Sequence, residues 1–202
     1  MAEPYLNDPD AIYRQSFSII DEEADFSALP DNLHPVVRRI VHACGMVDVA
    51  AAIRFAGDVA GNARRSIERG GIILCDVEMV RHGIIERRLP PATRTVCTLS
   101  ETRATKDRTR SAAAVERWRP MLGGAVCVIG NAPTALFRLL ELIDDGAEPP
   151  AAIFAFPVGF VGAVESKQAL IDHAGGVPYL TLPGRRGGSA MAAAAINGLF
   201  ND

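Results

Sequence analysis

The chain has 202 residues, a net charge of −3 at pH 7 and 49% hydrophobic residues. This length suits one domain with a substantial core, and the charge excludes the global basic field that gathers nucleic acid. No C-x-x-C pair occurs, so neither a zinc site nor a small disulfide scaffold is indicated by the cysteines Cys44, Cys75, Cys97 and Cys127.

The sequence also gives no sign of a membrane or secretory segment. Its first ten residues are acidic and lack the basic start and apolar run of a signal peptide. No run of about 18 apolar residues occurs anywhere. We therefore expect a cytoplasmic protein with reduced, buried thiols and with neither a membrane nor a nucleic acid as partner.

The first 70 residues read as helical, because apolar residues recur there at spacings of three and four. Asp58 suits a helix cap, and Gly45 suits the residue just past a helix end. The predicted helices cover about Pro9–Ala24, Pro35–Cys44, Val47–Phe55 and Asp58–Gly70.

The second of these helices places basic groups on one face. If Val36, Val37, Ile40, Val41 and Cys44 are buried, then Arg38, Arg39 and His42 point the other way. The helix dipole favours a charged His42 in the last turn, whereas the two arginines oppose it until an anion neutralises them. This pattern is typical either of a proton donor for an acidic substrate or of a plain surface helix with solvated charges.

The pattern changes at Gly71, where short apolar runs begin to alternate with helical segments. Such alternation predicts a parallel sheet covered by helices on both faces, a Rossmann-like three-layer α/β/α fold with about five strands. Pro178 suggests that the last strand lies at an edge. The predicted strands are Ile72–Cys75, Thr95–Leu99, Ala125–Ile129, Ala152–Phe156 and Val177–Leu182, and the helices are Asp107–Trp118, Pro133–Asp144, Gly162–His173 and Ser189–Leu199.

We expect a single domain over residues 1–202, with a helical N-terminal part (1–70) and an α/β sheet core (71–202). Ligands of such sheets bind beyond the carboxyl ends of the strands. Glycine in the loops there lets backbone amides approach an anion, although glycine also serves the turn geometry alone. The loops that follow four strands are 76–79, 130–134, 157–162 and 184–189.

Common enzyme fingerprints are missing from the sequence. It contains no G-x-G-x-x-G after a strand, no phosphate-binding P-loop, no G-x-S-x-G and no H-E-x-x-H. A nucleotide-dependent α/β enzyme therefore remains only a weak alternative.

Several motifs, taken together and in order, resemble those of the precorrin-8X methylmutase (precorrin isomerase) family of cobalamin biosynthesis. The resemblance covers nearly the whole chain. Its motifs are Ala11-Ile12-Tyr13 with Ser16-Phe17, Val41-His42-Ala43-Cys44-Gly45, Ile73-Leu74-Cys75-Asp76 with Glu78-Met79-Val80, Thr109-Arg110-Ser111, Gly130-Asn131-Ala132-Pro133-Thr134, Pro157-Val158-Gly159-Phe160 with Glu165-Ser166-Lys167, and Gly187-Gly188-Ser189.

The resemblance implies an isomerase that moves a methyl group between adjacent ring C carbons of precorrin-8X and gives hydrogenobyrinic acid, a tightly held product. No cofactor and no metal are implied, and family members resemble homodimers with sites at the subunit interface. Two alternatives stay open. In the first, the substrate is the cobalt form, cobalt-precorrin-8. In the second, the protein is a non-catalytic tetrapyrrole carrier.

The family's catalytic histidine maps onto His42, which is expected to protonate a ring nitrogen as a general acid. The resemblance assigns Ser16 and Arg39 to substrate binding, although a serine inside a helix is more often solvent-facing or bonded to a carbonyl. The substrate's many carboxylates call for cationic and amide partners. Further substrate-binding candidates are Arg110, Lys167, Gly187 and Gly188, with Arg185 or Arg186 beside the two glycines.

Overall fold

A single, mostly parallel sheet forms the centre of the protein in a computed structural model that describes residues 5–200. Its strands are β1 (Arg54–Ala56), β2 (Ile72–Cys75), β3 (Arg94–Cys97), β4 (Val126–Ile129), β5 (Ala152–Ala155) and β6 (Tyr179–Thr181). They lie in the order β1-β6-β5-β4-β2-β3. Only the β1–β6 pair of this sheet is antiparallel. The predicted three-layer, mainly parallel architecture is confirmed.

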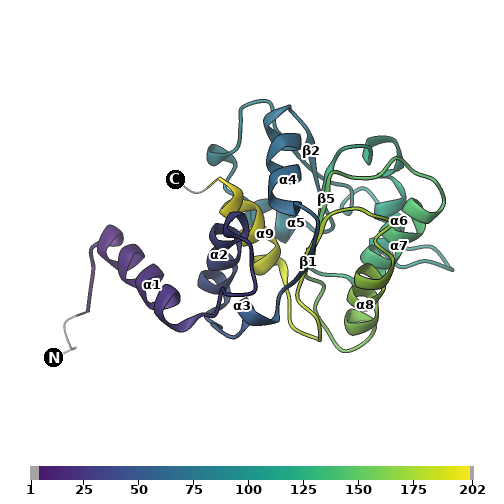
Figure 1. The fold of residues 1–202 in the computed structure, drawn as a ribbon. Helices are drawn as coiled ribbons and strands as arrows, with labels where there is room; N and C mark the ends of the chain where they lie inside the picture. Colours follow the sequence, from purple (N-terminus) through teal and green to yellow (C-terminus); the bar gives the residue numbers. More distant parts are fainter. Residues whose placement is uncertain (1–4, 201–202) are drawn as a thin grey trace.

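Helices cover both faces of this sheet (Figure 1). On one face lie α2 (His34–Cys44), α4 (Val59–Glu68), α5 (Glu78–Gly83) and α9 (Ser189–Leu199), and on the other α6 (Arg110–Glu116), α7 (Pro133–Asp144) and α8 (Ala163–His173). The remaining helical segments are α1 (Pro9–Glu23), α3 (Val49–Ala52), η1 (Asp31–Leu33), η2 (Glu86–Arg88) and η3 (Arg119–Met121).

The strands alternate their side chains between two cores. Val126 and Val128 of β4 are buried toward α9, whereas Cys127 and Ile129 are buried toward α7. This alternation follows from the period of two along a strand, and both faces are apolar because helices cover both.

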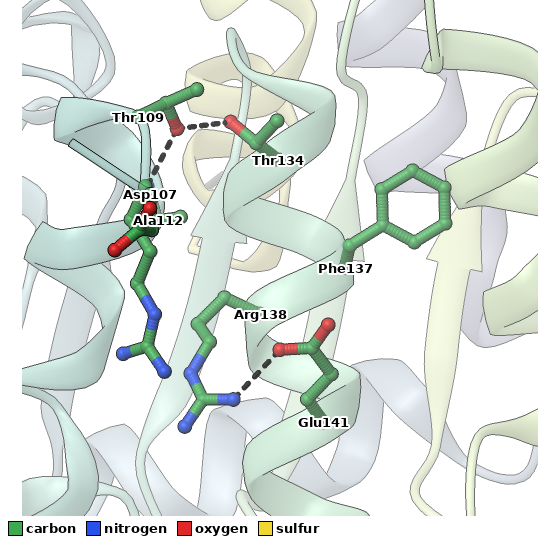
Figure 2. A pocket seen from close by; sticks show the side chains of 8 residues that line it. Asp107, Thr109, Ala112, Thr134, Phe137, Arg138 and Glu141 are labelled. Carbon is green, nitrogen blue, oxygen red and sulfur yellow. Dashed lines mark hydrogen bonds and ion pairs between the residues drawn. The ribbon is translucent and has the colours of Figure 1, made fainter. Parts of the chain in front are cut away.

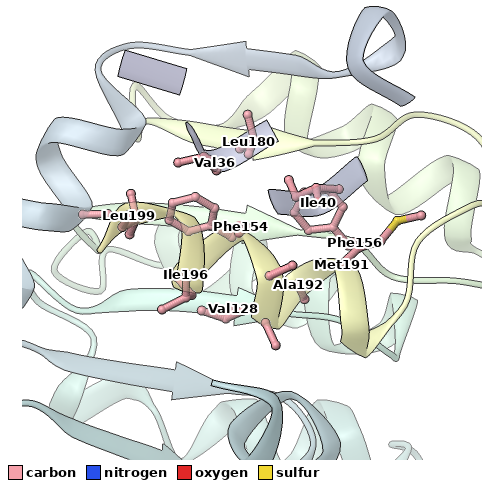
Figure 3. Packing of buried hydrophobic residues seen from close by; sticks show 14 of the residues in the cluster. Val36, Ile40, Val128, Phe154, Phe156, Leu180, Met191, Ala192, Ile196 and Leu199 are labelled. Carbon is pink, nitrogen blue, oxygen red and sulfur yellow. The ribbon is translucent and has the colours of Figure 1, made fainter. Parts of the chain in front are cut away.

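Helix α9 lies between the sheet and α2, which explains why all its residues except Ala190 are buried (Figure 3). Ala192 and Ile196 of α9 belong to the same buried cluster as Val36 and Ile40 of α2. A Cβ at Gly198 would lie 2.6 Å from the Cα of Val36, so this position has no room for a larger residue. The close approach makes α2 an outer layer held by apolar contact with α9.

Two details differ from the sequence-based expectation. Residues 47–55 were expected to form one helix, but the segment contains the short helix α3 and the first residues of strand β1. Because β1 pairs with β6, the sheet has six strands, and β6 lies inside it and not at the edge that Pro178 suggested. Pro178 precedes the first residue of β6, so its missing N–H costs this strand no ladder bond. Strand β1 has only three residues and lacks the longer apolar run by which the other strands were predicted, so it is recognised only by its pairing with β6.

Helix α1 stands away from the body of the protein (Figure 1). Of its residues only Ile20 is buried, whereas Ile12 is 46% and Ile19 is 43% exposed. Its inner side lies on α2, where it meets the basic face of that helix.

Candidate functional site

The C-terminal end of α2 presents His42 at the edge of the fold. Gly45 adopts a left-handed conformation (φ 68°) and its N–H donates to the Val41 carbonyl at 2.8 Å, which ends the helix. The Cys44 side chain is half-buried, while His42 is exposed. The predicted helix end and the place of His42 in the last turn are confirmed.

Helix α1 contacts the His42 ring through Ser16, Phe17 and, with centroids 6.0 Å apart, Tyr13. The Ser16 hydroxyl lies 2.9 Å from Nδ1, and the Phe17 ring stacks on the imidazole with centroids 5.0 Å apart. A hydroxyl that donates to Nδ1 leaves the ring proton on Nε2, and a charged ring donates from Nδ1 to the same oxygen. Ser16 therefore occupies Nδ1 in either state and leaves Nε2 free for a ligand. Sequence reasoning missed Phe17 as a site residue, because an aromatic inside an amphipathic helix reads as core.

Arg39 lies beside this pair and is only 9% exposed. Its Nη1 donates to the Tyr13 hydroxyl at 2.5 Å, and its guanidinium carbon lies 5.5 Å from the Tyr13 ring centroid. Arg38 points elsewhere and forms an ion pair with Asp21 at 2.5 Å. The basic face predicted for α2 therefore divides: Arg38 is neutralised, whereas Arg39 has a hydroxyl but no carboxylate partner among the described residues.

The surroundings of His42 disfavour its charged form. Although the side chain is largely exposed, partial burial of the ring lowers the pKa of His42 from its usual value of 6.5, and the positive charge of Arg39 lowers the pKa further. The ring is therefore mostly neutral at pH 7 without a ligand. An anion paired with Arg39 removes the second cause and favours protonation.

The loop before α9 reaches the same end of α2. Arg186 forms an ion pair with Asp48, its Nη1 2.6 Å from a carboxylate oxygen, and the same atom lies 3.9 Å from the Met46 sulfur. The Gly188 N–H donates to the Phe156 carbonyl at 2.8 Å. A Cβ at Gly187 would lie 2.3 Å from that carbonyl oxygen, so glycine is required for this close approach.

Two of the predicted substrate-binding residues lie elsewhere. Lys167 is fully buried, and its Nζ donates to the Arg186 carbonyl at 2.7 Å, so it faces the loop from inside and not an incoming ligand. Arg110 is exposed at the start of α6, on the opposite face of the sheet from α2. The structure therefore brings Ser16 into hydrogen-bond contact with His42 and places Arg39 near enough for its charge to act on the ring. The loop with Gly187 and Gly188 is linked through Arg186 to Met46 and Asp48, just after α2, and Arg110 lies on the other face of the sheet.

The loop after β4 is closed to anions by a carboxylate of the protein itself. Asp76 is 2% exposed and accepts backbone N–H groups from Gly130, Asn131 and Ala132 at 2.9, 3.0 and 3.0 Å. The amides expected to face a ligand are thus already used. The position of Asp76 directly after a buried strand is the sequence feature that could have predicted this role.

Replacing Asp76 with alanine is expected to lower the free energy of unfolding by about 2–4 kcal/mol, because three amide donors lose their acceptor. Urea denaturation measures the change. The exposed Asp144 at the end of α7 gives a matched control, since its alanine variant should stay within about 0.5 kcal/mol of the wild type. Equal stability of the two variants would contradict this role of Asp76.

A cavity of about 420 Å³ is lined by residues that include Thr109 and Ala112 near α6 and Thr134 and Arg138 of α7 (Figure 2). It lies on the opposite face of the sheet from α2 and His42. Both of its arginines are already paired with carboxylates: Arg138 contacts Glu116 and Glu141 at 2.7 Å, and Arg108 contacts Glu116 at 3.1 Å. The Thr109 hydroxyl caps α6 and lies 2.8 Å from the Thr134 hydroxyl. These internal contacts indicate that the residues here hold α6 and α7 together.

Residues 5–200 contain no group of three or more His, Cys, Asp or Glu side chains placed to hold a metal ion. Over the same residues, no helix combines the length and the apolar character that a membrane span requires.

Comparison with known proteins gives one consistent result. The family model for precorrin-8X methylmutase matches residues 11–201. The chain is 52% identical to a precorrin-8X methylmutase of Pseudomonas aeruginosa over 98% of both chains, and 49% identical to one of a Sinorhizobium species over 96% of this chain and 95% of that protein. A cobalt-precorrin-8 methylmutase of Leptospira interrogans is 34% identical over 94% of this chain and 91% of that protein.

The fold agrees with these relatives. A solved precorrin-8X methylmutase from Thermus thermophilus superposes with a TM-score of 0.84 at 35% identity, covering 95% of this chain and 94% of that one.

Proposed function

Because this chain belongs to the precorrin-8X methylmutase family and is an isomerase of cobalamin biosynthesis, we propose that it moves a methyl group between adjacent ring C carbons of precorrin-8X to give hydrogenobyrinic acid. The observation that carries this proposal is the arrangement around His42. Its Nδ1 is hydrogen-bonded to Ser16, its Nε2 has no hydrogen-bond partner among residues 5–200, and the charge of Arg39 acts on the ring.

In the proposed reaction His42 protonates a ring nitrogen of the macrocycle. Protonation withdraws electrons from the conjugated ring and makes the receiving carbon more electrophilic, which lowers the barrier to methyl migration. General acid catalysis of this kind contributes typically about 10²–10⁴-fold. The rest of the acceleration comes from holding the macrocycle in a reactive geometry.

Arg39 links substrate binding to this proton. A carboxylate of the macrocycle that pairs with Arg39 gains a charge-assisted hydrogen bond. The same pairing cancels the charge that lowers the pKa of His42. Binding of the acidic substrate thereby raises the fraction of His42 that carries the proton it must donate.

The metal-free macrocycle is the favoured substrate. The two relatives at 52% and 49% identity are named precorrin-8X methylmutases, whereas the cobalt-precorrin-8 methylmutase of Leptospira interrogans is 34% identical. Turnover of both macrocycles by the purified protein tests this choice. We expect conversion of precorrin-8X to a product of unchanged mass with a shifted absorption spectrum, and slower conversion of the cobalt form. Tight binding of both without conversion would instead indicate a tetrapyrrole carrier.

We further propose that the protein is a homodimer in which a second copy covers α1. Ile12 and Ile19 lie two helical turns apart and are about half exposed. The same helix carries residues that contact His42. An apolar helix face of this kind usually has a partner. A copy seated there would close the site around His42.

The change of Ile12 or Ile19 to glutamate is expected to shift the protein from dimer to monomer, because the dimer would bury a charge without a partner. Light scattering coupled to size-exclusion chromatography measures the mass. Arg14→Gln makes the chain more negative by the same one charge at an exposed position on the other side of α1, and it should leave the dimer intact. A monomeric wild type at micromolar concentration would contradict the proposal.

A further inference from the structure

We propose that Lys167 is a positioning residue, which holds the segment Arg185–Gly188 from inside the protein and so fixes the cationic loop beside the C-terminal end of α2. This inference rests on the proposed function, since it concerns how that loop receives the substrate. It differs from direct substrate binding, because the Lys167 side chain has no exposed surface.

The first argument is the cost of burying Lys167. Its relative exposure is 0%, and among the described residues no carboxylate lies within ion-pair distance of its Nζ. A buried ammonium without a counter-ion destabilises a fold, and an apolar residue of similar volume there is often neutral or stabilising. Burial also lowers the pKa of Lys167 to about 8. Because burying Lys167 lowers stability, its presence is better explained by the hydrogen bond that it makes than by a contribution to packing.

The second argument is what Lys167 contacts. Its Nζ donates to the Arg186 carbonyl at 2.7 Å, so α8 is tied to the backbone of the residue whose guanidinium meets Asp48 at 2.6 Å. Asp48 lies six residues after His42. The main chain and the side chain of Arg186 are therefore held separately, one from α8 and the other from the segment that follows α2.

The third argument is how little else fixes this loop. The Gly188 N–H bonds to the Phe156 carbonyl, and the Gly159 N–H bonds to the Arg185 carbonyl at 3.2 Å. The Arg185 guanidinium lies 5.3 Å from the ring centroid of Phe160, which is itself 83% exposed. Without the Lys167 contact, the Arg186 carbonyl has no donor among residues 5–200, and the backbone between these two bonds can shift while Asp48 still holds the Arg186 guanidinium.

Lys167→Met in the full-length protein tests the inference, because methionine is also unbranched, is only one atom shorter than lysine, and removes the donor. Hydrogen exchange of the Gly188 and Gly159 amides should accelerate at least about tenfold. The KM for precorrin-8X should rise about tenfold with kcat within twofold, and the melting temperature should not fall. Exchange of the Gly130 amide, which bonds to Asp76, should stay unchanged as an internal reference.

Ser166→Ala is the matched control. Ser166 is equally buried in α8, but its hydroxyl bonds within its own helix to the Ala163 carbonyl at 3.3 Å. This variant should match the wild type in both exchange and KM. Wild-type exchange and KM in Lys167→Met would overturn the inference, as would an unfolded variant or a parallel loss of kcat and stability. A wild type that exchanges as expected but converts no macrocycle would refute the proposed function instead.

Discussion

Replacement of His42 by alanine is expected to lower turnover of precorrin-8X about 10²–10⁴-fold with the fold intact. The expectation follows from the role of Nε2 as the proton donor and from the exposure of the ring, whose removal leaves no core cavity. Absorbance change under single-turnover conditions measures the rate. Circular dichroism and the melting temperature report the fold.

His173→Ala is the matched control for this variant. His173 is also exposed and also lies in the last turn of a helix, α8, but it has no place in the proposed site. Its turnover should equal that of the wild type. A His42→Ala protein that converts substrate at the wild-type rate would exclude the mechanism. A variant that binds the macrocycle normally but converts it slowly would show that His42 serves the chemical step and not binding.

Replacement of Arg39 by glutamine is expected to raise the KM for precorrin-8X about 10–100-fold, since a charge-assisted hydrogen bond contributes about 1.5–3 kcal/mol. The same change should raise the pKa of His42, because it removes the positive charge that opposes the imidazolium. Nuclear magnetic resonance titration of the His42 ring in both proteins measures the shift directly.

The pH dependence follows with a definite sign. A general acid must be protonated in the free enzyme, so kcat/KM should fall as the pH rises through the His42 pKa, which lies below 6.5 in the wild type. In Arg39→Gln this fall should move to higher pH. Arg38→Gln is the control, because Arg38 is paired with Asp21, and it should shift neither the KM nor the pH profile. An unchanged His42 pKa in Arg39→Gln would contradict the coupling.

The two variants also separate the alternative functions. A tetrapyrrole carrier needs Arg39 and the cationic loop but not the proton of His42, so His42→Ala would leave its function unchanged. An isomerase loses turnover in both variants, through the chemical step in His42→Ala and through weaker substrate binding in Arg39→Gln.

The sequence by itself determined the sheet core and the position of His42. Apolar runs of four to six residues between turn residues predicted β2 to β6 within a few residues, because each such run must be covered on both faces. Helical spacing and Gly45 likewise predicted the end of α2, since these are local signals. Family motifs then pointed to Ser16, which spacing alone could not single out from other serines inside helices.

Only the tertiary structure decided the partners of these residues. The contacts of His42 with Ser16 and Phe17 join residues 26 and 25 positions apart, and the Lys167–Arg186 bond likewise depends on how α8 packs beside the loop. Strand β1 is too short to be recognised without β6. The amides of residues 130–132 looked free in the sequence, but Asp76 takes all three, because parallel strands bring the loops after β2 and β4 to the same edge of the sheet. Local patterns fix which segments form, whereas side-chain pairing across segments depends on packing that no local pattern encodes.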